Sequence, residues 1–143
     1  MKTLTGSKKL EKFYTPNSIV ELCGELIKKT LKIQREDLII EPSAGCGAFI
    51  PLIKSLSDKY RFIDLKPDHP EVIEKYFLKV KVIIKNKERK VHIIGNPPFR
   101  LAVQFIKKCC KFANSISFIL PISFMKEFKK KSITLNFHLV AEA

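Results

Sequence analysis

The chain has 143 residues, 45% of them hydrophobic, and it carries 27 Lys and Arg against 14 Asp and Glu, a net charge of +13. A chain of this length can bury the core of one domain, which excludes an enzyme with a separate recognition domain. The charge favours a polyanionic partner such as nucleic acid over a small neutral ligand, although a composition rich in Lys, with only four Arg, also fits codon bias.

The cysteines and histidines do not predict a metal site. The four cysteines lack C-x-x-C spacing and the three histidines are scattered, so we expect reduced thiols within the core. No apolar run approaches the ~20 residues needed to span a bilayer, and the basic N-terminus lacks the apolar segment of a signal peptide. We therefore expect a soluble, intracellular protein.

Residues 1–12 are polar and basic and are expected to form an N-terminal arm, followed by one folded domain over residues 13–143. A helix is predicted after Thr15-Pro16, because Ser18 and Glu21 have the spacing of a capping box. Its apolar side chains repeat on one face and are Ile19, Leu22, Cys23, Leu26 and Ile27. The helix is expected to pack on the core through that face.

A strand, a glycine turn and a helix are predicted next. Asp37 to Ile40 leads into Glu41 as a buried strand, and Gly45-Cys46-Gly47 opens a helix from about Ala48 to Leu56. A dinucleotide-binding turn would require its third glycine at Ile50, and the acid at the end of the strand would repel a pyrophosphate. An acid beside glycines that permit close approach suits a ligand with an ammonium group.

A second strand is predicted over Arg61-Phe62-Ile63-Asp64. Asp64 lies 19 residues after Gly45, which is close to the ~20 residues typical of an acid that binds ribose hydroxyls. Further along, Val80 to Ile84 and Val91 to Ile94 have the pattern of two strands joined as a hairpin. Asp64 is therefore a candidate ligand-binding residue at the end of its strand.

The stretch that follows Ile94 carries the most specific pattern in the chain. Gly95 ends the apolar strand, and Asn96-Pro97-Pro98-Phe99 follows it. Two prolines fix φ at roughly −65° and remove two N–H donors, so carbonyls and the Asn96 side chain present acceptors with little freedom to move. Such acceptors suit an amino group, although the tetrapeptide is also compatible with a plain turn after a strand.

The C-terminal part of the chain predicts a helix, a strand, a basic run and another strand. The apolar face of the helix holds Leu101, Phe105, Cys109 and Phe112, and its other face holds Lys107, Lys108 and Lys111. Ser115 to Leu120 and Leu135 to Val140 are the predicted strands. The basic run between them, Lys126 to Lys131, fits either a solvated face or a contact with phosphates.

Three of these motifs together resemble a known family, the S-adenosylmethionine-dependent amino-methyltransferases, which include N6-adenine methyltransferases of DNA. Asn96-Pro97-Pro98-Phe99 after an apolar strand is similar to the fourth motif of that family. Glu41 to Phe49 is similar to the first motif, and Phe13-Tyr14-Thr15-Pro16 resembles the N-terminal cofactor motif. The motifs stand in the family's order over residues 13–99, which is far more specific than any one of them.

The resemblance implies an α/β, Rossmann-like, doubly wound and mostly parallel sheet, with six of the usual seven strands in this chain. In its strand order, 3-2-1-4-5, the third and fourth strands run parallel and lie roughly 14 Å apart. Residues 85–90 can hardly form that crossover, so the hairpin is rejected and the third strand is expected to end near Leu78. Where the family has an acid for the cofactor's adenine amino group, this chain has Tyr76.

The resemblance also implies roles for individual residues. The catalytic loop would be Asn96, Pro97, Pro98 and Phe99, in which the Asn96 side-chain oxygen and the Pro97 carbonyl accept the hydrogens of the target amine and Phe99 stacks on a flipped base. The implied cofactor-binding residues are Phe13, Tyr14, Thr15, Pro16, Glu41, Pro42, Ala44, Gly45, Gly47, Asp64 and Asn96. Residues 13–16 fit equally well a hydrophobic staple at the start of the helix.

The resemblance thus implies a methyltransferase that uses S-adenosyl-L-methionine and acts on an exocyclic amino group, foremost adenine N6 in DNA. Nucleic acid is the expected partner, DNA before RNA, with a second subunit as a conceivable source of target recognition. An amino group of RNA or protein is an alternative target. The rival class is a non-catalytic methyltransferase-like module that binds nucleic acid or a partner, which Tyr76 and the missing seventh strand favour and the intact Asn96 to Phe99 loop disfavours.

Overall fold

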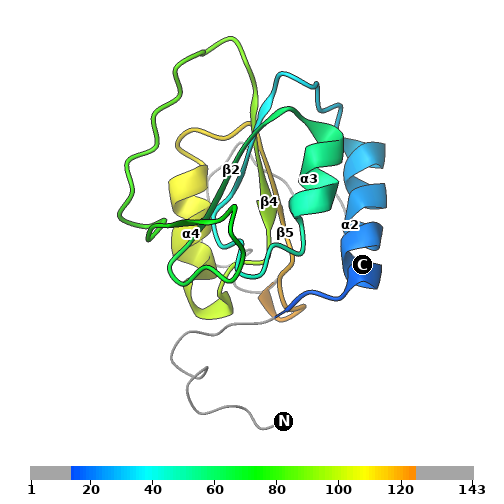
Figure 1. The fold of residues 1–143 in the computed structure, drawn as a ribbon, viewed down its shortest axis with the longest axis vertical. Helices are drawn as coiled ribbons and strands as arrows, with labels where there is room; N and C mark the ends of the chain where they lie inside the picture. Colours follow the sequence, from blue (N-terminus) through cyan, green and yellow to red (C-terminus); the bar gives the residue numbers. More distant parts are fainter. Residues whose placement is uncertain (1–13, 125–143) are drawn as a thin grey trace, which may run out of the picture.

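The computed structural model describes residues 14–124, which form a five-stranded parallel sheet with helices on both faces (Figure 1). The strand order is β3-β2-β1-β4-β5, and every pair of neighbours is parallel. The strands are β1 (Leu38–Glu41), β2 (Lys59–Asp64), β3 (Ile73–Glu74), β4 (Val91–Gly95) and β5 (Ser115–Phe118). The predicted α/β, doubly wound, Rossmann-like architecture with order 3-2-1-4-5 is confirmed over these five strands.

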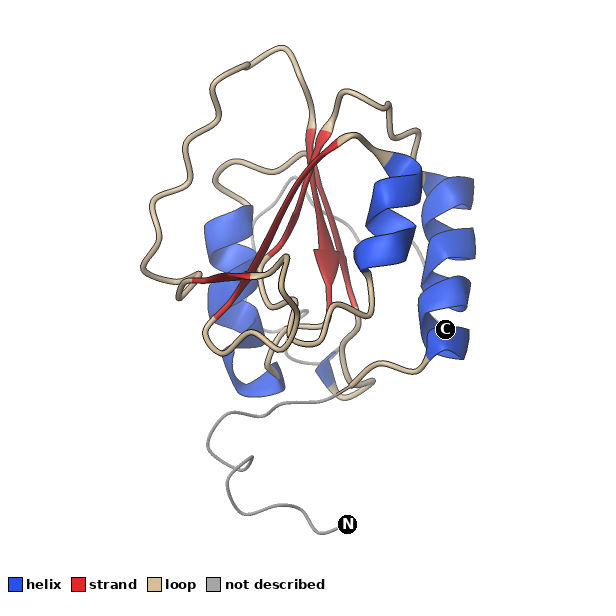
Figure 2. Ribbon diagram, in the orientation of Figure 1, coloured by secondary structure: helices blue, strands red, loops and turns tan. Residues whose placement is uncertain are grey.

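Helices cover the two faces of this sheet, as Figure 2 shows. One face is covered by α2 (Asn17–Thr30) and α3 (Ile50–Leu56), which lie side by side. The other face is covered by α4 (Ala102–Cys109), which continues from the short 3-10 helix η1 (Phe99–Leu101). Parallel strands need such crossover helices, because each strand must start again at the same edge of the sheet.

Alternating side chains divide the core between the two faces, as the period of two along a strand requires. Ile39, Phe62 and Ile94 pack with the helices α2 and α3. Their chain neighbours Ile40 and Ile63 point to the opposite face and pack with α4. Both faces of β1 and β4 are fully buried, which explains why these strands read as continuous apolar runs in the sequence.

The first helix is present, but the prediction that Ser18 and Glu21 form a capping box is wrong. Helix α2 begins at Asn17, so Ser18 lies inside the helix and Pro16 is the N-cap, without a side-chain capping bond. The proline sets the extended entry instead: its φ is −63° and its ψ is 151°. A proline can stand there because the first N–H groups of a helix have no intrahelical partner.

The third strand is shorter than the sequence predicts, because it ends at Glu74 and not near Leu78. It pairs with β2 only through Ile63 with Ile73 and Asp64 with Glu74. Beyond it the chain turns, and the Phe77 side chain is buried at 1% exposure against Phe105 of α4. Burying a large aromatic ring under the helix therefore takes precedence over extending the sheet edge.

A buried polar chain joins three strands at the edge of the sheet where they begin. His92 in β4 lies with Nε2 3.0 Å from Asp37 Oδ2 and Nδ1 2.7 Å from Ser115 Oγ. The Asp37 oxygen also accepts the Gln34 backbone N–H at 2.9 Å. These contacts explain how a histidine that is 3% exposed is tolerated in an apolar strand.

Several sequence predictions lie outside the described residues. They are the basic N-terminal arm of residues 1–12, Phe13, the basic run Lys126 to Lys131 and the sixth strand at Leu135 to Val140. These remain predictions.

Candidate functional site

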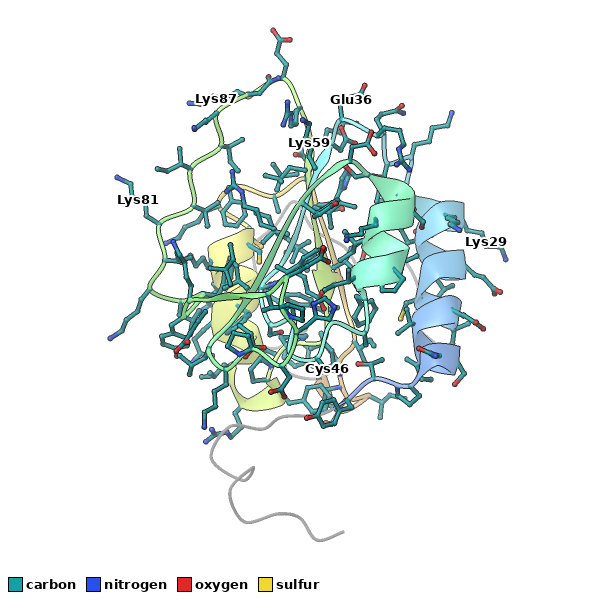
Figure 3. All side chains as sticks on the ribbon, in the orientation of Figure 1. Lys29, Glu36, Cys46, Lys59, Lys81 and Lys87 are labelled. Atoms are coloured by element: carbon teal, nitrogen blue, oxygen red, sulfur yellow. The ribbon has the colours of Figure 1, made fainter. Side chains whose placement is uncertain are left out.

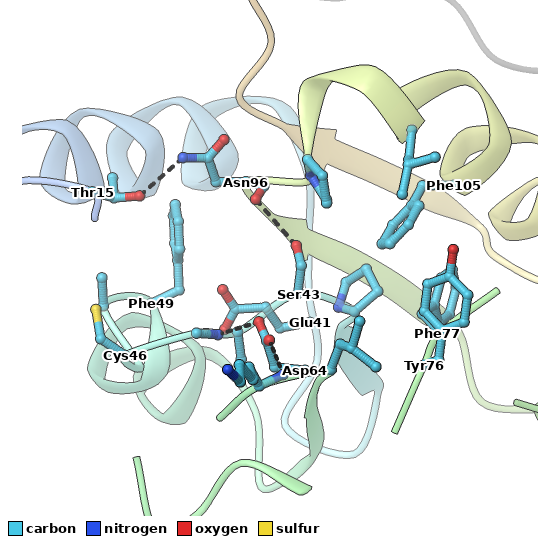
Figure 4. Close-up of a pocket in the computed structure, with 18 of the residues that line it drawn as sticks. Thr15, Glu41, Ser43, Cys46, Phe49, Asp64, Tyr76, Phe77, Asn96 and Phe105 are labelled. Carbon is cyan, nitrogen blue, oxygen red and sulfur yellow. Dashed lines mark hydrogen bonds between the residues drawn. The ribbon is translucent and has the colours of Figure 1, made fainter. Parts of the chain in front are cut away.

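The carboxyl ends of β1, β2 and β4 meet around a cavity of about 380 Å³, shown in Figure 4. Its wall is built from five segments that are distant in the chain: Thr15 before α2, most of residues 41–49, residues 64–66, Tyr76 and Phe77, and finally Asn96, Pro98, Arg100, Leu101 and Phe105. Ligands of open α/β sheets bind at this edge, where neighbouring connections leave the sheet on opposite faces. The cavity is therefore the candidate site.

The glycine turn forms one side of the cavity and depends on two glycines. Gly45 has a φ of 52° and Gly47 a φ of 84°, a left-handed region that side chains disfavour. A Cβ on Gly47 would also lie 2.8 Å from His69 and 2.9 Å from Ile50. The turn consequently brings bare backbone to the cavity, as the sequence pattern predicts.

Asp64 holds this turn in place from the end of β2. Its Oδ2 accepts the Gly45 N–H at 2.8 Å, and its Oδ1 accepts the Lys66 N–H at 2.7 Å. Each carboxylate oxygen has two lone-pair sites, so both can accept a further hydrogen bond. Asp64 thus supports the turn and still presents acceptor capacity to the cavity that it lines.

Glu41 is an acid buried at the end of β1, with 1% exposure. Its Oε1 atom has no hydrogen-bond partner among the described residues, and its stem packs so closely that a Cβ on Gly95 would lie 3.2 Å from Glu41 Cγ. Burial, followed by the charge of Asp64, raises the pKa of the Glu41 carboxyl well above its ordinary value. A buried carboxyl with an unused oxygen on a cavity wall is suited to a cationic ligand.

The Asn96 amide forms the opposite side of the cavity. Ser43 Oγ donates to the Asn96 carbonyl at 3.1 Å, and the Asn96 Nδ2 donates to Thr15 Oγ1 at 3.2 Å (Figure 4). The Asn96 Oδ1 is buried and has no hydrogen-bond partner among the described residues. Buried polar atoms are seldom left unsatisfied in native proteins, so this oxygen marks a place for a donor.

The structure brings most of the predicted site residues together but not all of them. Those in the cavity wall are Thr15, Glu41, Pro42, Ala44, Gly45, Asp64, Asn96 and Pro98. Tyr14 is 63% exposed and donates to Asp68 Oδ2 at 3.2 Å. Pro16, Gly47, Pro97 and Phe99 lie beside the wall in the chain without forming part of it.

The wall also contains residues that were not among the predicted site residues. They include Cys46, Phe49, Arg100, Leu101 and Phe105. Phe105 was predicted as part of an apolar helix face, and that face is shared between the core and the cavity. Tyr76, which the sequence analysis singled out, lies in the wall.

The described residues contain neither a cluster of side chains that could hold a metal ion nor a helix that could span a membrane. Within residues 14–124 no group of three or more His, Cys, Asp and Glu side chains could hold a metal ion. The four cysteines are free, and burial raises the pKa of the Cys109 thiol to about 12. No helix in this part of the chain is both long and apolar enough to cross a bilayer.

Comparison with known proteins finds similar folds among solved structures. No family model and no curated protein matches the chain. Among solved structures, the 23S rRNA methyltransferase ErmE aligns with a TM-score of 0.63 and 11% identity over 80% of this chain. An rRNA methylase from Streptococcus thermophilus aligns with a TM-score of 0.52 and 10% identity over 83% of both chains.

At such identities the likeness concerns the fold alone. The chain spans about half of the ErmE structure, since the alignment covers 50% of it. The five-stranded parallel sheet, its order and its helices are therefore those of a Rossmann-like methyltransferase fold.

Proposed function

We propose that the chain binds S-adenosyl-L-methionine and transfers its methyl group to an exocyclic amino group of a nucleobase, adenine N6 above all. The observation that carries this proposal is the Asn96 amide, whose Oδ1 is buried without a partner while its Nδ2 is held by Thr15. A buried acceptor without a partner, on a residue that lines the cavity, suits an N–H donor of the substrate. The likeness to two rRNA methyltransferase structures supports the reaction class.

The residues around the glycine turn fit the cofactor. Glu41 offers a buried, unpartnered carboxyl oxygen for its ammonium group, and the Gly45 turn permits close backbone approach. Asp64 offers acceptors for ribose hydroxyls. When bound, S-adenosylmethionine supplies an activated methyl group on a positively charged sulfur. Tyr76 stands where an acid would bind the adenine amino group, so weaker binding than in the resembling family is expected.

The Asn96 loop fits the acceptor amine. The lone pair of an aromatic amine is delocalised into its ring, which makes the nitrogen a poor nucleophile. Asn96 Oδ1 and the Pro97 carbonyl would accept the two amine hydrogens and draw the nitrogen toward tetrahedral geometry. Thr15 accepts from the amide nitrogen, which leaves the amide oxygen as the acceptor without a partner. Neither acceptor is basic enough to keep a proton, so the extra proton passes to solvent.

The target base would have to leave its stack to reach this loop. Phe99, at the start of η1, is the aromatic side chain next to the proline pair, and stacking on such a ring contributes ~1–3 kcal/mol per base. That amount helps to offset the few kcal/mol needed to extrude a base from a duplex. DNA and RNA present the same adenine edge, so both are candidate substrates.

The test is transfer of a tritiated methyl group to adenine-containing DNA and RNA oligonucleotides, compared for wild type, Asn96→Ala and Gln34→Ala. Gln34 is exposed in the turn before β1, at the edge of the sheet opposite the cavity, and truncating its side-chain amide controls for a general effect. We expect transfer by wild type and Gln34→Ala, loss with Asn96→Ala, and no transfer to oligonucleotides in which inosine replaces adenosine. Mass analysis of the digested nucleosides then distinguishes N6-methyladenosine from a methylated guanine.

Two results would contradict the proposal in different ways. Cofactor binding by calorimetry without transfer to any nucleic acid would favour the non-catalytic module. Transfer to a protein substrate, with none to DNA or RNA, would keep the reaction and replace the target.

A further inference from the structure

Positive charge is concentrated in one part of the described chain. Residues 75–111 contain eleven Lys and Arg and one acid, Glu88, a net charge of +10. Residues 14–74 contain eight Lys and Arg and ten acids, a net charge of −2. The overall positive charge is therefore not a uniform property of a lysine-rich composition, because the first half of the described chain is slightly acidic.

The fold gathers this charge on one flank of the molecule. Lys108 of α4 donates its Nζ to the carbonyls of Phe77 and Val80, which fastens the loop of residues 75–90 beside the helix. Lys79 and Lys81 stand on either side of Val80 in that loop. We call the loop of residues 75–90, together with η1, α4 and the turn that follows α4 as far as Lys111, the basic flank. Figure 3 shows Lys81 and Lys87 on this side and Lys29 of α2 on the opposite side.

Most of these charges face solvent, and at least two of them, Lys108 and Lys111, lie close enough to interact. Nine of the eleven Lys and Arg side chains of the basic flank are exposed. Burial, together with the charge of Lys111, lowers the pKa of the Lys108 ammonium, whereas the charge of Cys109 opposes the shift. By contrast, the surface ion pairs Arg35–Asp58 and Lys54–Glu71 belong to the other part of the chain. A concentration of like charge destabilises a fold, and a polyanion would relieve it.

The basic flank also leads to the cavity. Tyr76 and Phe77 at the start of the loop, and Arg100, Leu101 and Phe105 at the start of the helical segment, line the cavity wall. A chain of phosphates that follows the flank would therefore end at the mouth of the site. Phosphate contacts position a nucleic acid without reading its sequence, which fits lysines on an exposed loop.

We propose that the basic flank binds the phosphodiester backbone of a polynucleotide and directs one of its bases into the cavity. The second half of this statement rests on the proposed function, whereas the first half does not. The surface lies within the described fold and is distinct from the basic run of residues 126–131 that the sequence had suggested. RNA and DNA share the backbone chemistry, and the experiment below separates them.

The experiment compares two triple variants that remove the same charge. Lys79→Gln, Lys81→Gln and Lys111→Gln remove three charges from the basic flank. Lys28→Gln, Lys29→Gln and Lys32→Gln remove three charges from the last turn of α2 and the segment just after it. All six lysines are exposed. Binding of fluorescent single-stranded RNA, single-stranded DNA and duplex DNA is measured by anisotropy without cofactor over a series of salt concentrations, and circular dichroism checks folding.

We expect the flank variant to lose roughly tenfold or more in affinity near 0.1 M salt, and the control variant to lose much less. The slope of log affinity against log salt should fall by ~0.7 per lost contact on single strands and ~0.9 on duplex DNA. Equal losses in the two variants, or no loss in either, would overturn the proposal, as would a wild type that binds none of the three probes.

A second measurement does not depend on the variants folding. Acetylation of wild-type lysines, read by mass spectrometry, should be suppressed by the bound oligonucleotide at Lys79, Lys81 and Lys111 and not at Lys28, Lys29 and Lys32. Protection of both groups alike would contradict a localised surface. Flank-dependent binding without methyl transfer would leave the backbone-binding half of this inference standing and remove the proposed function. Methyl transfer with flank-independent binding would support the proposed function and overturn this inference.

Discussion

The Asp64 carboxylate has two roles, whereas the sequence pattern predicted only one of them, the binding of a ligand. Both of its oxygens accept backbone N–H groups, from Gly45 and Lys66, so it fixes the glycine turn whether or not a cofactor is present. It also lines the cavity, where ribose hydroxyls are proposed to bind. Removing it should therefore impair cofactor binding both directly and through the turn.

We predict that Asp64→Ala weakens S-adenosylmethionine binding by roughly ten- to a hundredfold, since hydrogen bonds to a charged group contribute about 1.5–3 kcal/mol each. Asn96→Ala, which faces the target amine, should change cofactor affinity much less. Isothermal calorimetry measures both. Asp58→Ala, which removes an exposed carboxylate paired with Arg35, is the matched control. Equal affinity in wild type and Asp64→Ala would remove the ribose assignment.

The buried carboxyl of Glu41 should make the stability of the free protein depend on pH. Burial and the nearby Asp64 raise its pKa well above the ordinary value, so the folded protein holds a proton that the unfolded chain releases at about pH 4.3. Above that pH the unfolded state binds fewer protons than the folded state, and stability falls as pH rises through the window between the two pKa values. Above the folded pKa the carboxyl is ionised in both states, and its ionisation lowers the stability no further.

We predict that Glu41→Gln abolishes this dependence of stability on pH. The difference in unfolding free energy between Glu41→Gln and wild type should grow in favour of the variant as pH rises from about 4 toward 7. Urea unfolding at a series of pH values measures this difference. The same variant should bind S-adenosylmethionine more weakly, because an amide cannot ionise beside the ammonium group as a carboxyl can when the cofactor binds. A difference that is constant with pH would show that Glu41 ionises normally in the fold.

At the scale of elements, the polar chain of Asp37, His92 and Ser115 links β1, β4 and β5 at the edge opposite the cavity. Burial alone would raise the pKa of the Asp37 carboxyl, but hydrogen bonds from Gln34 and His92 and the charge of His92 lower it below its ordinary value. The carboxylate therefore stabilises the fold at pH values above its unfolded pKa of about 3.9. That contribution is lost as pH falls through the lower folded pKa.

We predict that Asp37→Ala lowers the unfolding free energy by about 2–4 kcal/mol at pH 7, because it leaves a buried His92 nitrogen and the Gln34 N–H without their partner. The deficit relative to wild type should shrink as the pH is lowered below about 4. Chemical denaturation at several pH values gives the comparison. A deficit within about 0.5 kcal/mol, as expected of an ordinary surface change, would show that the chain of contacts contributes little.

The arrangement of the elements also explains why the third strand ends early. Strand β3 is at the edge of the described sheet, where a longer strand would gain hydrogen bonds on one side only. Phe77 instead packs against Phe105 and Phe112, and Lys108 binds the carbonyls freed from the sheet. The same contacts hold the start of the loop of residues 75–90, which is part of the basic flank, against α4.

At the scale of the whole molecule, the cavity exists only when five distant parts of the chain are assembled. Its wall takes residues from Thr15 to Phe105, so the unfolded chain offers no comparable site. A ligand that binds only the folded state stabilises it in proportion to the logarithm of its concentration. The cofactor should therefore stabilise the entire fold, and not one element.

We predict that S-adenosylmethionine raises the unfolding free energy by about 2.7 kcal/mol when its free concentration is a hundred times its Kd. Thermal unfolding at increasing cofactor concentration measures the effect. The Asp64→Ala variant should need a correspondingly higher concentration for the same shift. An unfolding temperature that stays constant up to millimolar cofactor would argue against the cavity as its site.

Much of the fold could be predicted from the sequence because the features concerned are local. Apolar runs such as Leu38–Glu41 and Val91–Gly95 identify buried strands wherever they stand, and positive φ at Gly45 and Gly47 is a requirement of the turn itself. The Asn96-Pro97-Pro98 loop is stiff for covalent reasons, so its proximity to the cavity followed from the end of its strand. Most predicted site residues accordingly line the cavity.

Other features depend on which distant residues become neighbours, and the order of residues does not reveal them. The unpartnered Asn96 oxygen arises because Thr15, 81 residues away, takes the amide nitrogen. The end of β3 was set by the burial of Phe77 under α4, and the basic flank by Lys108 joining a loop to a helix. The local sequence pattern specifies strands and turns through backbone sterics and side-chain alternation. An unpartnered buried oxygen and a concentration of charge on one flank arise instead from packing between distant segments, which exists only in the assembled fold.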